Sequence, residues 1–170
     1  NLEQTELFYE QTIPHQEIKA IYQSDDHPNF TLVDKENGGK SDALNAGINV
    51  SDYDLICSID ADSILEQDVL KKLIQTFVRH KDTVAAGGIV RVINGCKIRN
   101  REIEEIHVPD SFLARVQSVE YLRAFLFGRV GWDYLRGLLI ISGAFGIFDR
   151  KAILEVGGYL TNSVGEDIEL

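Results

Sequence analysis

The chain has 170 residues, enough for one domain with a sizeable hydrophobic core. Hydrophobic residues make up 44% of it and charged residues 26%, a globular composition that excludes a disordered chain. Its 27 Asp and Glu residues outnumber its 17 Lys and Arg residues, and the net charge of −10 argues against a nucleic-acid surface, which would carry a basic stripe. Cys57 and Cys96 are expected to be buried thiols, not a disulfide framework or a zinc site.

Strand and helix signals alternate along the chain. The alternation predicts an α/β fold with a mainly parallel sheet covered by helices on both faces. In chain order, the first expected elements are a strand at 30–33, a helix from a cap at Ser41 or Asp42 to residue 49, a strand at 55–59, a helix at 66–80, and a strand at 83–93 broken or bulged at Gly87-Gly88. A long connection follows from Asn94-Gly95 to about residue 110, and its approach at 90–92 suggests a hairpin. The last expected elements are a helix at 112–127, a strand pair or one kinked strand at 138–141 and 144–148 around Ser142-Gly143, and a helix at 150–156 stopped by Gly157-Gly158.

Two carboxylates, Asp60 and Asp62, follow directly after the expected strand 55–59. Ligands gather outside the carboxyl ends of strands in open α/β sheets. Acids one residue apart repel each other unless a cation lies between them, and Mg²⁺ prefers such oxygen ligands and often shares them with substrate phosphates. Taken alone, an Asp-x-Asp tripeptide is more often a solvated turn than a metal site, so the choice between the two depends on the other segments of the chain.

A glycine-rich loop, Glu36-Asn37-Gly38-Gly39-Lys40-Ser41, leads into the first expected helix. Such loops favour phosphate binding. A P-loop is excluded because its first glycine would have to stand at Asp34, where an acid repels phosphate. Lys40 remains a candidate phosphate-facing cation, and the alternative is a solvated lysine at a helix start.

Two further segments carry candidate chemistry. Ser142-Gly143-Ala144-Phe145-Gly146 places small residues inside an apolar strand, which allows a ligand to approach the backbone or allows tight packing. Gly165-Glu166-Asp167 supplies a second pair of acids after a polar loop, a weak signal when taken alone.

Together, the segments at 37–47, 59–62, 142–146 and 165–167 resemble the family 2 glycosyltransferases of the GT-A fold. The likeness is to the bacterial membrane synthases related to cellulose, chitin, hyaluronan and poly-N-acetylglucosamine synthases, and it covers residues 30–170. The order and separation of the segments fit that family. The combination is far more specific than any one of the segments.

The resemblance implies roles for residues at the matching positions. The roles are donor and metal binding for Asp60 and Asp62, proximity to the nucleotide for Lys40, the general base for Asp167 with Glu166 as its neighbour, and the vicinity of donor sugar and acceptor for Ser142 and Gly143. It further implies an inverting enzyme, dependent on Mg²⁺ or Mn²⁺, that moves a sugar from a nucleotide-diphospho-sugar, expected to be a UDP-sugar, to a saccharide acceptor.

Two features of that family are absent from the chain. Its first strands, which hold the uridine, are not found, and its later Gln-x-x-Arg-Trp motif is missing because the only Trp, Trp132, follows Gly131. We therefore expect residues 1–170 to form a single partial catalytic domain without the N-terminal strands. The resemblance places such a domain at the cytoplasmic face of a bacterial membrane, attached through segments outside these residues.

Two alternatives from other classes remain at this point. A phosphatase of the haloacid-dehalogenase type also has a strand-end Asp-x-Asp, and Asp60 would then be a covalent phosphoryl acceptor. That alternative leaves the Gly38-Gly39-Lys40 and Ser142-Gly143 segments unexplained. A sugar-nucleotide sensor without turnover would keep the binding residues and lack transfer.

Overall fold

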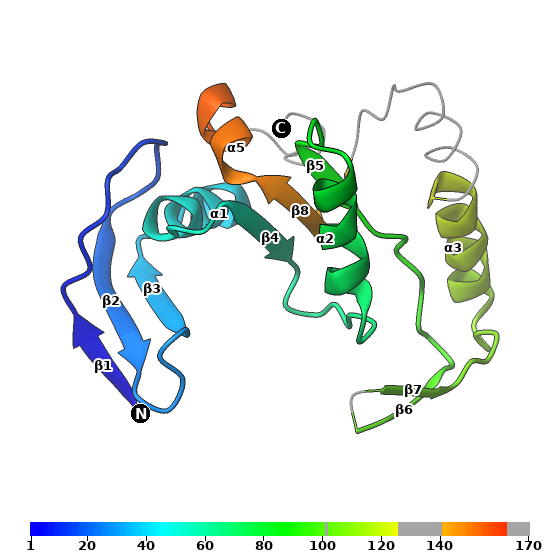
Figure 1. The fold of residues 1–170 in the computed structure, drawn as a ribbon. Coiled ribbons are helices and arrows are strands. Elements are labelled where there is room, and N and C mark those ends of the chain that lie inside the picture. Colours follow the sequence, from blue (N-terminus) through cyan, green and yellow to red (C-terminus); the bar gives the residue numbers. More distant parts are fainter. Residues whose placement is uncertain (101, 126–140, 163–170) are drawn as a thin grey trace. The chain divides into compact units, whose positions relative to one another are not determined.

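The structure is a computed structural model that describes residues 1–100, 102–125 and 141–162. Contacts divide it into two compact units, the first made of Asn1–Ile56 with the described residues from Phe148 onward, and the second of the described part of Cys57–Ile147. The elements in Figure 1 are, in chain order, β1 (Leu2–Thr5), β2 (Ile18–Ser24), β3 (Thr31–Lys35), α1 (Gly39–Val50), β4 (Leu55–Ile59), α2 (Val69–Arg79), β5 (Ala85–Gly87), β6 (Lys97–Arg99), β7 (Glu102–Glu105), α3 (Phe112–Leu122), β8 (Phe145–Asp149) and α5 (Arg150–Val156). These mixed helices and strands confirm the α/β class.

Strands β1, β2 and β3 form an antiparallel meander in the first unit (Figure 1). Leu2 pairs with Ser24 across β1 and β2. A tight turn returns the chain from β2 to β3, closed by a hydrogen bond of 2.8 Å from Phe30 N to His27 O. Short connections of this kind join antiparallel strands only. The sequence predicted β3, but β1 and β2 were missed because their exposed, mixed composition lacks a clear apolar run.

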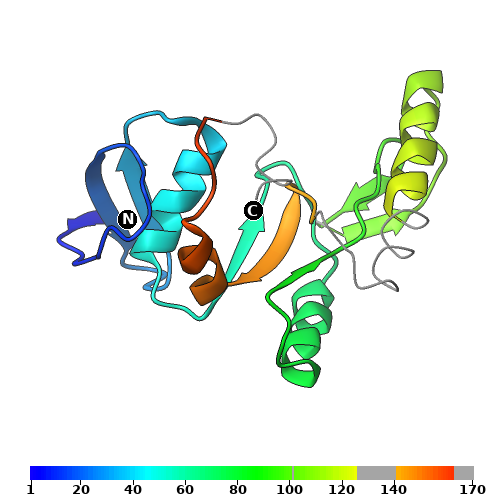
Figure 2. The ribbon, with the colours of Figure 1, turned by 90° about the horizontal axis from the view of Figure 1, so that it is seen from above.

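Helix α1 carries the core of the first unit. Figures 1 and 2 both show it between the β1–β3 meander and α5. The core cluster consists of Ile13, Ile48, Ile153 and Tyr159, with Leu44, Ile56, Phe148 and Leu154 packed against it. Ile48 of α1 packs in this cluster with Ile13 from the loop before β2 and with Ile153 of α5. Because burial of apolar surface is the main favourable term in folding, these contacts hold the loop and α5 against α1.

The start of α1 differs from the prediction. The helix begins at Gly39 with Gly38 as its N-cap, and neither Ser41 nor Asp42 caps it. Asn37 closes the turn instead, because its side-chain Oδ1 accepts a hydrogen bond of 3.1 Å from Gly39 N. Asp42 lies inside the helix, where it is buried and forms an ion pair with Lys35.

A second sheet has the strand order β4-β8-β5. Asp60 N donates to Ala144 O at 3.0 Å, and Arg150 N donates to Asp54 O at 2.8 Å. Each bond joins the end of one strand to the beginning of the other, so β4 and β8 run antiparallel. The expected mainly parallel pairing does not hold for this pair, for the meander or for the β6–β7 hairpin.

The remaining predicted elements are found with shorter bounds. Strand β4 has the bounds expected for it, whereas α2 begins three residues later than expected. The strand expected at 83–93 is reduced to β5, which ends at Gly87. A Cβ atom at Gly87 would lie 2.8 Å from Ile141 Cγ2, so the glycine there serves close packing. The hairpin suggested by the approach at 90–92 to Asn94-Gly95 is not found there, because β6 and β7 form a hairpin further along, inside the stretch expected as a long connection.

The later helices agree with the predictions where the structure describes them. Helix α3 covers the first part of the helix expected at 112–127, and residues 126–127, like 138–140 of the expected strand pair, lie outside the described residues. Helix α5 ends at Gly157, whose φ of 89° is the left-handed conformation that favours glycine.

Neither cysteine forms a disulfide. Cys57 is exposed and Cys96 is of intermediate exposure, so the expected burial of both thiols is wrong. Side chains alternate across a strand, and in β4 the buried face belongs to Ser58. Partial burial still raises the pKa of the Cys57 thiol. No helix in the described part of the chain is long and apolar enough to cross a membrane.

Candidate functional site

The carboxylates of Asp60 and Asp62 lie at the carboxyl end of β4, as the sequence predicted. A tight turn follows the strand, with a hydrogen bond of 3.0 Å from Ser63 N to Asp60 O. Asp60 is half-buried and Asp62 is exposed. The turn therefore presents Asp62 to solvent directly after a sheet strand.

The turn at Ser142-Gly143 lies beside Asp60. It precedes β8 and is closed by hydrogen bonds from Ala144 N to Ser142 Oγ at 3.3 Å and from Phe145 N to Ser142 O at 3.2 Å. The bond from Asp60 N to Ala144 O then joins this turn to the end of β4. Two segments predicted separately from the sequence are thus adjacent in the second unit.

Lys40 is the second residue of α1, in the first unit, and its side chain is exposed. The turn before it depends on Gly39, whose φ of 85° is left-handed. Backbone N–H groups at a helix start and a cationic side chain both favour an anion. The local geometry therefore fits the expected phosphate-facing lysine.

The acid in the same loop is already paired. Lys19 Nζ lies 2.9 Å from Glu36 Oε1. This hydrogen bond and the positive charge of Lys19 hold the pKa of the Glu36 carboxyl below its usual value. The negative charge of Glu36 is therefore compensated by Lys19.

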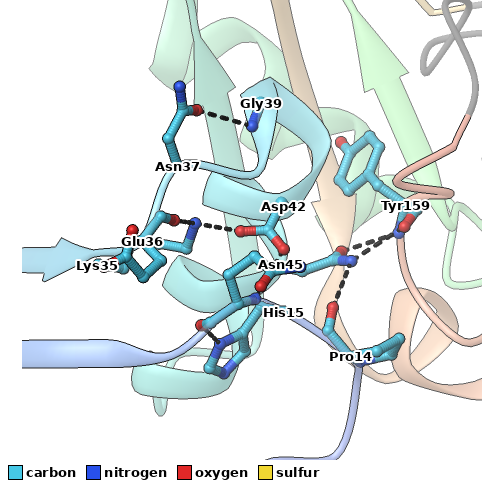
Figure 3. A network of polar contacts seen from close by, with 10 residues as sticks. Pro14, His15, Lys35, Glu36, Asn37, Gly39, Asp42, Asn45 and Tyr159 are labelled. Atoms are coloured by element: carbon cyan, nitrogen blue, oxygen red, sulfur yellow. Dashed lines mark hydrogen bonds and ion pairs between the residues drawn. The ribbon is translucent and has the colours of Figure 1, made fainter.

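Sequence reasoning missed a buried polar network on α1 (Figure 3). Asp42 Oδ1 accepts a hydrogen bond of 2.7 Å from Gln16 N. Asn45 donates to Pro14 O at 3.0 Å and to Tyr159 O at 2.9 Å, and its Oδ1 accepts from Tyr159 N at 2.9 Å. Asn49 bonds the backbone of Thr12 and Ile13. The spacing of the three polar residues along one helix face could have revealed the network.

Glu166 and Asp167, the expected base and its neighbour, lie outside the described residues. Within the described ranges, no three His, Cys, Asp or Glu side chains gather into a metal site. Asp60 and Asp62 supply two hard oxygen donors, one of them exposed, which suits an ion that takes its other ligands from water and a diphosphate. The donor set fits Mg²⁺ or Mn²⁺ in that shared form.

Comparison with known proteins agrees with this arrangement. Residues 14–157 match the family model described as glycosyl transferase family 2. The chain is 34% identical over 153 residues to a poly-beta-1,6-N-acetyl-D-glucosamine synthase of Staphylococcus aureus (strain COL), and 30% identical over 151 residues to a synthase of the same name from Staphylococcus epidermidis. Each match covers 88% of this chain and 33% of the relative, so the chain spans about a third of their length. Its α/β architecture is accordingly of the GT-A type, and the chain belongs to glycosyl transferase family 2.

Proposed function

We propose that the protein containing these residues is an inverting glycosyltransferase that moves a sugar from a UDP-sugar to a saccharide acceptor. The observation that supports this most is the adjacency of the strand-end carboxylates of Asp60 and Asp62 to the Ser142-Gly143 turn. Family membership removes the support for a phosphatase with Asp60 as nucleophile. The names of the relatives make N-acetylglucosamine the first sugar to test, with a growing polysaccharide as acceptor.

The residues divide the work of binding and proton transfer. Asp60 and Asp62 would hold Mg²⁺ or Mn²⁺, and the bound ion would neutralise the diphosphate leaving group. Lys40 would contact the donor phosphates at the start of α1. Ser142 and Gly143 would line the position of the donor sugar, where small residues leave room for it.

Asp167 would act as the general base. It would take the proton from the acceptor hydroxyl while that oxygen attacks the anomeric carbon, with Glu166 as its neighbour. A single displacement inverts the anomeric centre, so an α-linked donor gives a β-linked product. We place this chemistry at the cytoplasmic face of the membrane, where UDP-sugars are available, with attachment through segments outside these residues.

The role of Asp62 is tested by titrating the full-length protein with UDP-N-acetylglucosamine, with and without a chelator. Asp62→Asn should weaken donor binding about tenfold or more and should remove the effect of the chelator, since a charged contact is lost. Asp52→Asn is the matched control, because Asp52 is an exposed acid shortly before the same strand. Equal affinity of the wild type and Asp62→Asn in both conditions would exclude the proposed metal site.

The role of Asp167 is tested by a separate pair of measurements. Asp167→Asn should lower the rate of transfer by about 10²–10⁴-fold, the usual contribution of a general base, while donor binding persists. The product linkage should be β by anomeric coupling in NMR. Donor binding without transfer by the wild type would point to a sugar-nucleotide sensor, and an α-linked product would contradict the inverting mechanism.

A further inference from the structure

The loop that leads to Lys40 is built around the buried carboxylate of Asp42 (Figure 3). Lys35, the last residue of β3, forms an ion pair with Asp42 Oδ2, and the two side chains are only 10% and 2% exposed. Lys35 Nζ also donates a hydrogen bond of 2.6 Å to Glu36 O, the first carbonyl of the loop. Asp42 therefore fixes the point at which the loop leaves the sheet.

The same carboxylate also shapes the other end of the loop. A Cβ atom at Gly38 would overlap the side chain of Asp42, so the backbone at Gly38 passes directly over it. Asp42 is held from a third direction by Gln16 N at 2.7 Å. The backbone between Lys35 and Lys40 thus has both ends set by one side chain.

Stability alone is a poor explanation for this arrangement. The cost of removing two charges from water roughly offsets their attraction, and apolar pairs of similar volume often stabilise a protein at least as well. A buried ion pair does specify geometry, because each oxygen of Asp42 must meet one particular partner, Lys35 Nζ or Gln16 N. That geometry concerns the loop that presents Lys40.

We propose that Asp42 is a positioning residue for nucleotide-sugar binding, which acts by holding the Lys35–Gly39 backbone so that Lys40 meets the donor phosphates. The inference rests on the proposed function. It assigns Asp42 no contact with the substrate, because its carboxylate is occupied by Lys35 and Gln16. Lys35, although a cation directly before the loop, is paired with Asp42, and the proposal does not make it a second phosphate ligand.

The test is a double-mutant cycle in the full-length protein, with UDP-N-acetylglucosamine as donor. Asp42→Asn should raise the donor KM about tenfold, the coupling expected between residues of one network, and leave kcat within about twofold. In a Lys40→Ala background the same change should have no further effect on KM. A titration with UDP alone should show the same pattern, so binding is read without turnover.

Asn49→Asp is the matched control. Asn49 is also buried on α1, at 3% exposure, and the substitution again exchanges one side-chain atom, but its bonds go to Thr12 and Ile13 and not to the loop. It should lower the unfolding midpoint as Asp42→Asn does, yet leave the donor KM unchanged. A merely structural role of Asp42 would make the two variants behave alike.

If Asp42→Asn does not fold, Lys35→Gln combined with Asp42→Asn removes both buried charges and takes its place in the cycle. Under the proposal this pair also raises the donor KM, and Lys40→Ala again cancels its effect. An unchanged KM in the variant that folds, or effects that add to that of Lys40→Ala, would overturn the inference while the proposed function stands. A wild type that binds no nucleotide-sugar would overturn the proposed function and the inference with it.

Discussion

Helices α1 and α2 are nearly equal in length, 12 and 11 residues, yet they differ most in what they bury. On α1 six residues are buried, and four of them are polar: Ser41, Asp42, Asn45 and Asn49. On α2 none is buried, although its apolar residues repeat clearly on one face. Hydrophobic periodicity therefore indicates that a helix forms, but it does not measure how deeply that helix is buried.

The difference has a physical basis in the contacts that each helix makes. The buried amides of α1 bind backbone groups of Ile13 and Tyr159, segments remote in sequence. Backbone groups in a core need partners, and an amide side chain supplies a donor and an acceptor together. On α2 a polar contact is instead local and exposed, since Lys72 Nζ lies 2.9 Å from Oδ1 of the N-cap residue Asp68. Exposed ion pairs of this kind are worth little.

The largest effect is expected where the polar core of α1 is removed. Asn45→Leu would leave both backbone groups of Tyr159 buried without their partner, and it would also remove the hydrogen bond to Pro14 O. The free energy of unfolding should fall by about 3 kcal/mol or more, since each unsatisfied group costs about 1–3 kcal/mol. Denaturant-induced unfolding measures this.

Gln75→Leu on α2 is the control for Asn45→Leu. Gln75 is exposed, so the same gain of apolar surface should change the free energy of unfolding by less than about 0.5 kcal/mol. An equal loss of unfolding free energy in Asn45→Leu and Gln75→Leu would contradict the difference in burial between α1 and α2.

The second effect is a difference in stability between alanine substitutions at two glycines, Gly38 at the N-cap of α1 and Gly47 within α1. A Cβ atom at Gly38 would overlap Asp42, whereas at Gly47 it would meet nothing within 4 Å. Gly38→Ala should therefore destabilise the protein by about 1–3 kcal/mol, the usual cost of overpacking. Gly47→Ala should stabilise it by about 0.5–1 kcal/mol, because alanine is the better helix former. Thermal unfolding should show midpoint shifts of opposite sign, and shifts of the same sign would contradict the packing at Gly38.

Much of the fold could be predicted from short-range patterns. Strand β4 and helix α5 have the expected bounds because their signals are local, an apolar run in one and a glycine stop in the other. Strands β1 and β2 could not be predicted, since their stability comes from pairing with each other and with β3. The direction of strand pairing likewise depends on partners distant in the sequence.

The candidate site divides in the same way. The position of Asp60 and Asp62 follows from the strand before them, and the sequence was enough to predict it. The neighbourhood of Asp60 and the Ser142-Gly143 turn was suggested only by family resemblance, because it depends on the pairing of β4 with β8. Asp42 was misjudged as a helix cap, since its partners Lys35 and Gln16 precede it and only the tertiary structure brings them to it.

The smallest effect concerns the exposed apolar face of α2. Val78 is 63% exposed there, so Val78→Gln removes little buried surface and should change the free energy of unfolding by less than about 0.5 kcal/mol. Denaturant unfolding of the 170-residue chain and of the full-length protein, each with and without the substitution, measures this in both settings. A small change in the short chain with a loss of about 1 kcal/mol or more in the full-length protein would show that another segment covers this face. A large loss in the short chain itself would mean that α2 is buried like α1, and the contrast between the two helices would then fail.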